Sequence, residues 1–402
     1  MDTSWGRNDK RNLGVLFFAQ ATIGSQLPMH IILGGLAGAL LAPTPALATL
    51  PISVVVLMSM FTAPVASMLM GRFGRRLGFL LGALAGIGAA STVIRALFTG
   101  SFVLLVAGSA LFGIAQSVHA FYRFAAADAV TDSFKPKAIS IVFGGGLVSA
   151  LLGPELVQRF GGALLPVQFA GAYAAIVVLN VVGIVILLLL RMPPPVRRQA
   201  SESGGRPLSV IFKDPRVLAA VVCGTVSYAV MSLVMTSTPL AMVAHGFTSD
   251  HAADVVRWHV VSMFAPSFFT GALIARFGYA PIIGLGLVCL AICAGIALAG
   301  VDLHKFYLAL IMLGVGWNFG FVGATSLLAS AHTMEEQARV QGLNDFILFG
   351  CVAVASFSSG ALLNGFGWNA VQYAALPAVG IAAVMLVWFA LPRRQVRVQA
   401  PE

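Results

Sequence analysis

Two pairs of soft metal-ligand side chains stand at helical spacing in an otherwise apolar chain. Met231 and Met235 form an M-x-x-x-M pattern, and His259 and Met263 form an H-x-x-x-M pattern further along. Residues four positions apart share one face of an α-helix, so each pair presents two donors together. Thioether sulfur favours Cu(I), whereas imidazole accepts copper, zinc, nickel or iron. The four residues predict a copper site if two neighbouring helices turn these faces toward each other.

Composition determines which elements position these residues. Of 402 residues, 59% are hydrophobic and 9% are charged, whereas soluble domains carry about 25% charged residues. Because a helix needs about 20 apolar residues to cross a bilayer, the chain is predicted to be an all-α membrane protein. We expect twelve transmembrane helices, near 13–41, 46–70, 77–98, 101–126, 137–158, 165–190, 215–242, 253–275, 280–300, 304–331, 338–363 and 367–391.

The seventh and eighth of these helices bring the donors to matching depths. Met235 and His259 lie 7 and 6 residues from the outer ends of their helices, and Met231 and Met263 lie 11 and 10 residues in. At about 1.5 Å per residue, the four donors form two adjacent levels. Methionine is equally typical of flexible packing in an apolar helix, but an imidazole inside a membrane is costly and typically functional.

The net charge of +10 reflects membrane topology and does not indicate a nucleic-acid partner. Most Lys and Arg residues flank one side of the predicted helices; those on or near the other side are Arg95, Arg159, Arg257 and Lys305. The positive-inside rule therefore predicts a multi-pass protein with both termini in the cytoplasm and the lipid bilayer as a partner. The four cysteines fall within predicted helices, which does not indicate a disulfide framework.

A polar segment, residues 191–214, divides the chain into an N-terminal half, 1–190, and a C-terminal half, 215–402, that holds the proposed metal site. Its Pro, Gly, Ser and Arg content is typical of a flexible cytoplasmic linker. The halves also resemble one another: Arg-Phe-Gly follows both the second and the eighth helix, at 72–74 and 276–278. Paired six-helix repeats with a site between them are typical of secondary transporters.

The loop between the second and third helices carries a family resemblance. Its signature is roughly G-x-x-x-D-R-x-G-R-R, and this chain supplies Arg72, Gly74, Arg75 and Arg76, with Gly71 in place of the acidic residue. On these residues the whole chain resembles the major facilitator superfamily. The resemblance implies two six-helix halves and a conformational-switch loop. The countercharge would come from Asp128, Asp132 or Asp345; alternatively, the arginines only set topology.

The two four-residue motifs resemble those of the CcoA-type bacterial copper importers in this superfamily. The resemblance implies that copper is a transported substrate, with no cofactor, and that Met231, Met235, His259 and Met263 bind it. It implies import across the bacterial inner membrane to supply cytochrome oxidase assembly, with cytoplasmic or membrane copper chaperones as partners. Candidates for a metal relay are Cys223, Met29, His30 and His119, and candidates for proton coupling are Glu155 and Asp345.

Motifs of other function classes are missing from the sequence. It contains no G-x-x-x-x-G-K-[ST], G-x-S-x-G, H-E-x-x-H or C-x-x-C pattern, so we expect neither an enzyme nor an ATP-driven motor. Gradient-driven transport is the predicted mechanism. Two alternatives remain: a carrier or exporter of a small organic molecule, with methionines and aromatic residues in its pocket, and a non-transporting copper-handling assembly factor.

Overall fold

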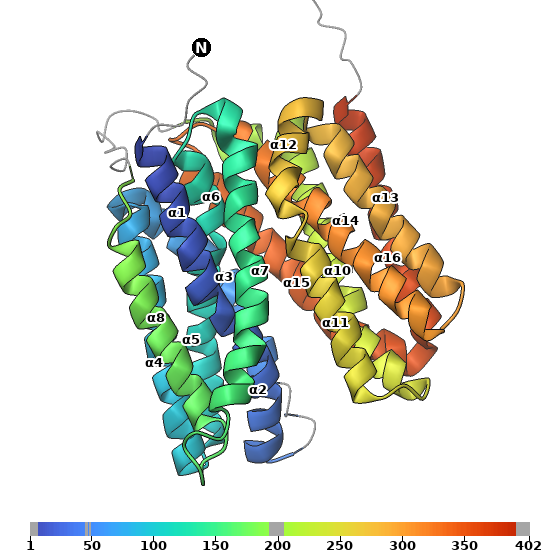
Figure 1. Cartoon of the computed structure of the whole chain (residues 1–402). Helices are drawn as coiled ribbons and strands as arrows, with labels where there is room; N and C mark the ends of the chain where they lie inside the picture. The colour runs from blue at the N-terminus through green and yellow to red at the C-terminus, as the bar shows by residue number, and fades with distance from the viewer. Residues whose placement is uncertain (1–6, 45–46, 48–49, 193–204, 391–402) are drawn as a thin grey trace, which may run out of the picture.

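The chain folds into a bundle of long helices (Figure 1). The computed structural model describes residues 7–44, 47, 50–192 and 205–390. Its α-helices are α1 (Arg7–Thr22), α2 (Gln26–Leu41), α3 (Leu50–Phe73), α4 (Arg75–Thr99), α5 (Phe102–Ala120), α6 (Tyr122–Asp128), α7 (Lys135–Phe160), α8 (Ala170–Leu187), α9 (Leu208–Ile211), α10 (Pro215–Ala244), α11 (Ser249–Phe264), α12 (Ser267–Phe277), α13 (Tyr279–Leu298), α14 (Leu303–Ser330), α15 (Gln337–Phe366) and α16 (Trp368–Ala390).

Twelve helical spans in the described part of the chain are long and apolar enough to cross a membrane, as predicted. Three of these spans consist of two helices each: α1 with α2, α5 with α6, and α11 with α12. The last break falls at Pro266, because proline has no N–H to donate within a helix. Of the predicted linker 191–214, residues 193–204 lie outside the described part, and α9 occupies four residues of the described remainder, Leu208–Ile211.

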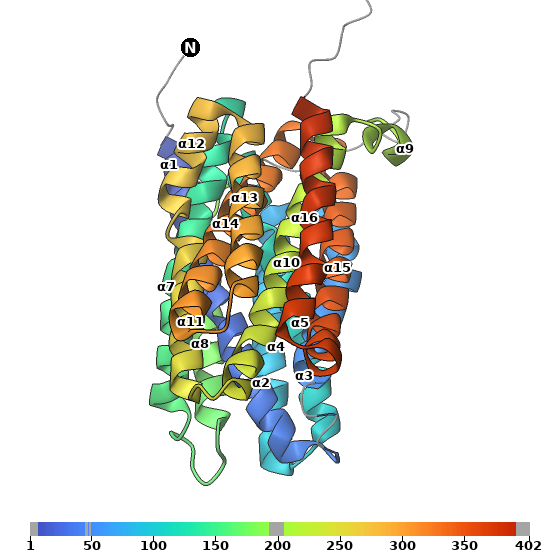
Figure 2. The same ribbon diagram turned by 90° about the vertical axis from the view of Figure 1, so that its right-hand side faces the viewer.

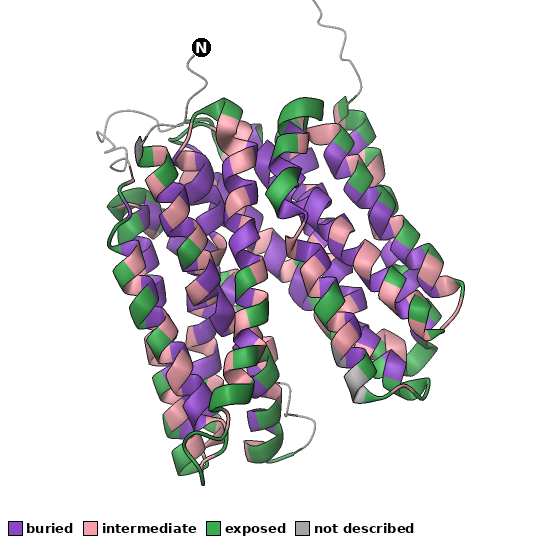
Figure 3. Cartoon of the chain, in the orientation of Figure 1, coloured by how far each residue is buried: buried purple, intermediate pink, exposed green. Residues whose placement is uncertain are grey.

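The helices form two groups, α1–α8 and α10–α16, which contact each other mainly through α3 against α15 and α7 against α11, α12 and α14. Figure 1 shows the groups drawn together at the end where α1 starts and α16 stops, hereafter the terminal end, and apart at the opposite, distal end. Buried residues fill each group, and exposed ones cover the outer faces (Figure 3). Val185 and Val384, at 61% and 72% exposure, are apolar side chains on such faces, as expected where lipid replaces water.

Glycines occupy equivalent points in the two groups. Gly74 and Gly278, with φ of 92° and 87°, precede α4 and α13 at turns that disfavour a side chain. A Cβ on Gly113 of α5 would lie 2.6 Å from a carbonyl oxygen of α3, and one on Gly314 of α14 would lie 2.6 Å from a carbonyl oxygen of α11. These are the fourth spans against the second spans of each group, so the shared glycines hold the same backbone contacts in both.

The segment before α9 is held to the second group by a buried carboxylate. Glu336, which is 1% exposed, accepts hydrogen bonds from the backbone N, Nε and Nη2 of Arg206 at 3.1, 2.7 and 2.9 Å, and from the backbone N of Thr333 at 3.1 Å. The hydrogen bonds from Arg206 lower the pKa of Glu336 to about 2. The contact therefore fixes the segment at the terminal end, where Figure 2 shows α9.

Replacing Arg206 with Ala is expected to destabilise the protein by about 1–3 kcal/mol, because it leaves a buried acceptor short of donors. The matched control is Arg216→Ala, which removes an exposed pair with Asp214 and costs under about 1 kcal/mol. Thermal unfolding of the purified protein measures both.

The same contact predicts a pH dependence. Since pairing lowers the pKa of Glu336 from 4.5 to about 2, its contribution is complete above pH 4.5 and is lost as the pH falls toward 2. The difference in midpoint between the native chain and Arg206→Ala should therefore shrink below pH 4.5. Equal midpoints for Arg206→Ala and Arg216→Ala at pH 7 would contradict this account.

Candidate functional site

The four predicted metal ligands lie in the second group, inside its apolar core. Met231 and Met263 are 5% and 8% exposed, and Met235 packs against the same core. His259 is fully buried; its Nδ1 lies 2.9 Å from the carbonyl oxygen of Leu310 on α14, and its Nε2 has no hydrogen-bonding partner. The described contacts thus tie the imidazole to α14, and none of the described hydrogen bonds joins it to a methionine.

The relay candidates are divided between the two groups: Cys223 lies on α10 of the second group, and Met29, His30 and His119 lie on α2 and α5 of the first. Cys223 donates to the carbonyl oxygen of Ala382, 3.5 Å away on α16. His30 and Met29 are buried within the first group, where His30 stacks on Phe112 with ring centroids 4.3 Å apart. Within the described residues, no three His, Cys, Asp or Glu side chains gather closely enough to hold a metal ion.

The switch-loop arginines differ in their surroundings. Arg75 is 9% exposed and contacts Asp128 of its own group at 2.9 Å and Gln341 of the other group at 2.6 Å. Gln337 of α15 also donates to Asp128. Arg72 and Arg76 are exposed, with Arg72 over the ring of Phe73, and Gly74 forms the turn between them. Of the three predicted countercharges, Asp128 is the one that meets the loop, and it does so where the two groups touch.

A second contact between the groups joins α7 to α12. Ser140 donates to the backbone carbonyl of Ser267 and accepts from the backbone N of Gly271 at 2.9 Å. A Cβ on Gly271 would lie 2.5 Å from the carbonyl oxygen of Pro136, so the backbones pack directly. Together with the Arg75 contacts, this packing closes the terminal end.

Toward the middle of the bundle, a buried ion pair crosses between the groups. Arg123 of α6 and Asp345 of α15 are 5% and 0% exposed and are bonded side chain to side chain. Asn344 also donates to Asp345 at 2.8 Å. Asp345 Oδ2 and Arg123 Nε nevertheless lack partners. Of the two proton-coupling candidates, Asp345 is therefore buried between the groups, whereas Glu155 is half exposed and pairs with Arg159 on one helix.

A cluster of five aromatic rings begins at this ion pair. Arg123 sits over the ring of Phe321, 4.9 Å from its centroid, and Phe321 stacks on Trp317 with centroids 5.2 Å apart and planes at 26°. Tyr228, Phe143 and Phe264 meet Trp317 edge-on at 5.7–5.9 Å. We call these five rings the central aromatic cluster. Phe143 comes from the first group and the others from the second, so the cluster lies where the groups meet.

Three rings of the cluster and a polar side chain of the first group lie at one depth. Tyr228 is 13 residues from the terminal end of α10, Trp317 13 from that of α14, and Phe264 13 from that of the α11–α12 span. Gln116 is 12 residues from the terminal end of the α5–α6 span. At 1.5 Å per residue these positions are about 20 Å deep, near the middle of a membrane, where secondary carriers bind substrate.

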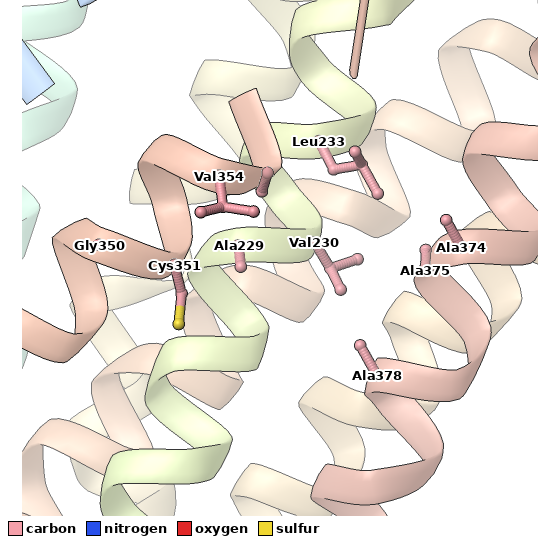
Figure 4. Close-up of a pocket in the computed structure, with 10 residues that line it drawn as sticks. Ala229, Val230, Leu233, Gly350, Cys351, Val354, Ala374, Ala375 and Ala378 are labelled. Carbon is pink, nitrogen blue, oxygen red and sulfur yellow. The ribbon is translucent and has the colours of Figure 1, made fainter. Parts of the chain in front are cut away.

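One pocket lies away from this centre (Figure 4). It has a volume of about 300 Å³ between α10, α15 and α16, and its lining side chains are apolar apart from the Cys351 thiol. Val354 on its wall is 67% exposed. Because the walls offer no charged or strongly hydrogen-bonding group, we assign this pocket no part in recognising a polar substrate.

The central aromatic cluster was absent from the sequence-based prediction of the site. The chain has 28 Phe residues and 5 Trp residues, and an aromatic residue in an apolar helix gives no sign of whether it faces lipid or a partner helix. Gln116 did carry a usable signal: it is a polar residue within a span, three positions before His119. Polar groups inside membranes are costly and therefore informative.

Comparison with known proteins identifies relatives along the whole chain. The family model of the Major Facilitator Superfamily matches residues 13–356. A riboflavin transporter of Brucella anthropi, RfnT, is 45% identical over 381 residues, which cover 94% of this chain and 95% of that protein. An uncharacterized MFS-type transporter of Bacillus subtilis, YdeG, is 28% identical over 399 residues, which cover 94% and 90%.

Solved structures share the fold at low sequence identity. The fucose:proton symporter FucP of E. coli superposes with a TM-score of 0.78 at 14% identity, over 96% of this chain and 100% of that chain. A bacterial homologue of the iron transporter ferroportin, in an outward-facing state, superposes with a TM-score of 0.74 at 16% identity, over 96% and 100%. These likenesses establish the twelve-helix fold.

The prediction of copper import is wrong. A relative at 45% identity along nearly the whole chain is a riboflavin transporter, which favours an organic substrate and the organic-carrier alternative. The M-x-x-x-M and H-x-x-x-M motifs misled because methionine pairs are common in apolar cores. Two further expectations depended on a copper substrate and no longer have support: the supply of copper to an oxidase, and copper chaperones as partners.

Replacing Arg75 with Ala is expected to loosen the terminal end, because it removes the contacts with Asp128 and Gln341. Ser67, which is 1% exposed and packs against Gly342 of the other group, is a suitable reporter once changed to Cys in a chain whose native cysteines are Ala. Maleimide labelling of this reporter should rise several-fold with Arg75→Ala and stay unchanged with Arg72→Ala. Equal labelling in all three backgrounds would exclude Arg75 as a latch.

Replacing Arg123 with Leu leaves the carboxylate of Asp345 buried without its charge partner, which costs about 3–5 kcal/mol. The double variant Arg123→Leu, Asp345→Leu removes both charges and should recover most of this loss. Thermal midpoints of the purified variants measure the coupling between the two residues. A double variant that is less stable than Arg123→Leu alone would mean that the two charges do not depend on each other.

Proposed function

We propose that this chain, which belongs to the Major Facilitator Superfamily, is a secondary carrier of riboflavin or a closely similar flavin. The observation that carries the proposal is the 45% identity with a riboflavin transporter over 94% of the chain. The 381 aligned residues cover most of the chain and therefore include most of the helices that meet at the centre. A substrate with a planar aromatic ring also agrees with the aromatic cluster between the two groups.

The proposed mechanism is alternating access about the central aromatic cluster. In this structure the groups contact each other through the Arg75–Gln341 hydrogen bond and the Ser140–Gly271 packing, both toward the terminal end. The basic residues at that end favour a cytoplasmic location for it, by the positive-inside rule. The arrangement then corresponds to a carrier closed on the cytoplasmic side of a bacterial inner membrane, with the loop at Arg72–Arg76 acting as the switch.

The buried Asp345 supports coupling of transport to a cation gradient. Opening the terminal end separates α6 from α15 and so parts Arg123 from Asp345. A lone carboxylate at this depth is unfavourable. Protonation of Asp345 removes that charge, so we propose that a proton accompanies this step.

Transport is tested with radiolabelled riboflavin in proteoliposomes containing the purified chain. Uptake several-fold above that of empty vesicles is expected, and it should be abolished by excess unlabelled riboflavin. Equal uptake by vesicles with and without the correctly inserted protein would refute the proposal.

A matched variant separates this function from the earlier metal-site hypothesis. Met231→Leu with Met235→Leu keeps the side-chain volume and removes the soft sulfur donors, and such isosteric changes are well tolerated. Riboflavin uptake by this double variant should stay within about twofold of the native chain. Uptake that falls to the level of empty vesicles would mean that the two methionines are needed for transport.

A further inference from the structure

We propose that the site has two parts: the second-group rings of the central aromatic cluster, Tyr228, Phe264, Trp317 and Phe321, take the planar ring of the flavin, and Gln116 and His119 of the first group take its hydroxylated side chain. This inference rests on the proposed function and assigns residues that the comparisons do not. It follows from three features: the half-buried rings, the unpartnered polar atoms and the shared depth of both.

The rings offer both stacking surface and a polar edge. Trp317 and Phe321 are 3% and 2% exposed and form the base of the cluster, while Tyr228, Phe143 and Phe264 are only partly buried. Planar rings gain from offset and edge-on packing with such a set. Trp317 Nε1 and Asp345 Oδ2 are buried beside the cluster without hydrogen-bonding partners. One donates and the other accepts, as the carbonyl and N–H edge of a flavin ring requires.

The first group offers two unpartnered polar side chains near the same depth. Gln116 and His119 are three residues apart on α5, so they share one helix face. Gln116 Oε1 and His119 Nε2 are buried without partners. A Cβ on Gly24 would lie 3.1 Å from His119 Nε2, which places the imidazole beside the break between α1 and α2. A chain of hydroxyl groups can both donate to and accept from such atoms.

The two sides belong to different helix groups, so a bound substrate would link the groups. A ligand with its ring on the second group and its hydroxylated chain on the first group touches both halves of the carrier at once. A molecule that lacks either part would engage only one half. The bipartite site therefore predicts that an amphipathic flavin holds the two groups together better than a bare ring or a bare polyol does.

Binding is tested with two probes on the purified carrier: riboflavin and lumiflavin, which keeps the ring and has methyl in place of the ribityl chain. Stacking on Tyr or Trp quenches flavin fluorescence, so quenching reports ring placement separately from transport. Tyr228→Leu should weaken both probes about tenfold, within the range for ring stacking, and Tyr228→Phe should retain binding. Tyr373→Leu, which removes a 62% exposed Tyr on α16, is the matched control and should bind normally.

The polar side is tested with Gln116→Leu. This variant should weaken riboflavin about fivefold, as expected for loss of one hydrogen bond, and leave lumiflavin unchanged. Riboflavin binding that is unaffected by Tyr228→Leu would overturn the ring assignment, and equal loss of both probes in Gln116→Leu would overturn the assignment of the side chain; either leaves the proposed function standing. Absence of riboflavin binding by the folded native chain would overturn the proposed function and this inference together.

Discussion

A charge buried at the depth of a bilayer needs a partner, and here the partners stand on opposite helix groups. Arg123 and Asp345 are both almost fully buried and meet across the interface between the groups. Removing either would leave the other without compensation in surroundings of low dielectric constant. The two charges can therefore be buried only while the two groups are in contact. Separating the groups would leave each charge buried without its partner unless one of them is neutralised.

Other contacts between the groups lie on either side of this ion pair. On the terminal side of the ion pair, Arg75 joins Asp128 and Gln341, and the glycine-lined approach of α12 to α7 keeps the backbones close. On the other side, Phe321 lies under the guanidinium of Arg123 and supports the stacked ring of Trp317. The same arginine thus contacts both the carboxylate of a proposed coupling step and the aromatic cluster of a proposed binding step.

The two groups share equivalent glycines at equivalent points of their helices. Gly113 and Gly314 hold the same helix pairs together in each group, and Gly74 and Gly278 form the same turn. Small residues allow close backbone packing within each group, and the interface combines packing of α3 on α15 and of α7 on α11, α12 and α14 with a few polar contacts. The bound segment at Arg206 and Glu336 adds a fixed point beside α15, one residue from Gln337, which donates to Asp128.

The sequence by itself determined that the chain is built from membrane-spanning helices in two similar halves. Runs of apolar residues of membrane length leave only helices as spanning elements, so twelve spans follow from composition, and the Arg-Phe-Gly turns at Gly74 and Gly278 indicated the repeat. It also identified Arg75 as part of a switch-loop motif and Asp345 as a candidate for proton coupling. It did not determine which partner each would meet, because Asp128, Asp132 and Asp345 were equivalent candidates on spacing alone.

The tertiary structure decided which helix faces meet, which the spacing behind the copper hypothesis could not determine. Met231 and Met235 share a helix face by spacing, but spacing says nothing of what that face touches, and the fold places it in an apolar core. The central aromatic cluster shows the converse. Its rings come from α7, α10, α11 and α14, and no period in the sequence links Phe143 to Trp317. Packing between helices that are distant in the chain, which local patterns cannot encode, brought them together.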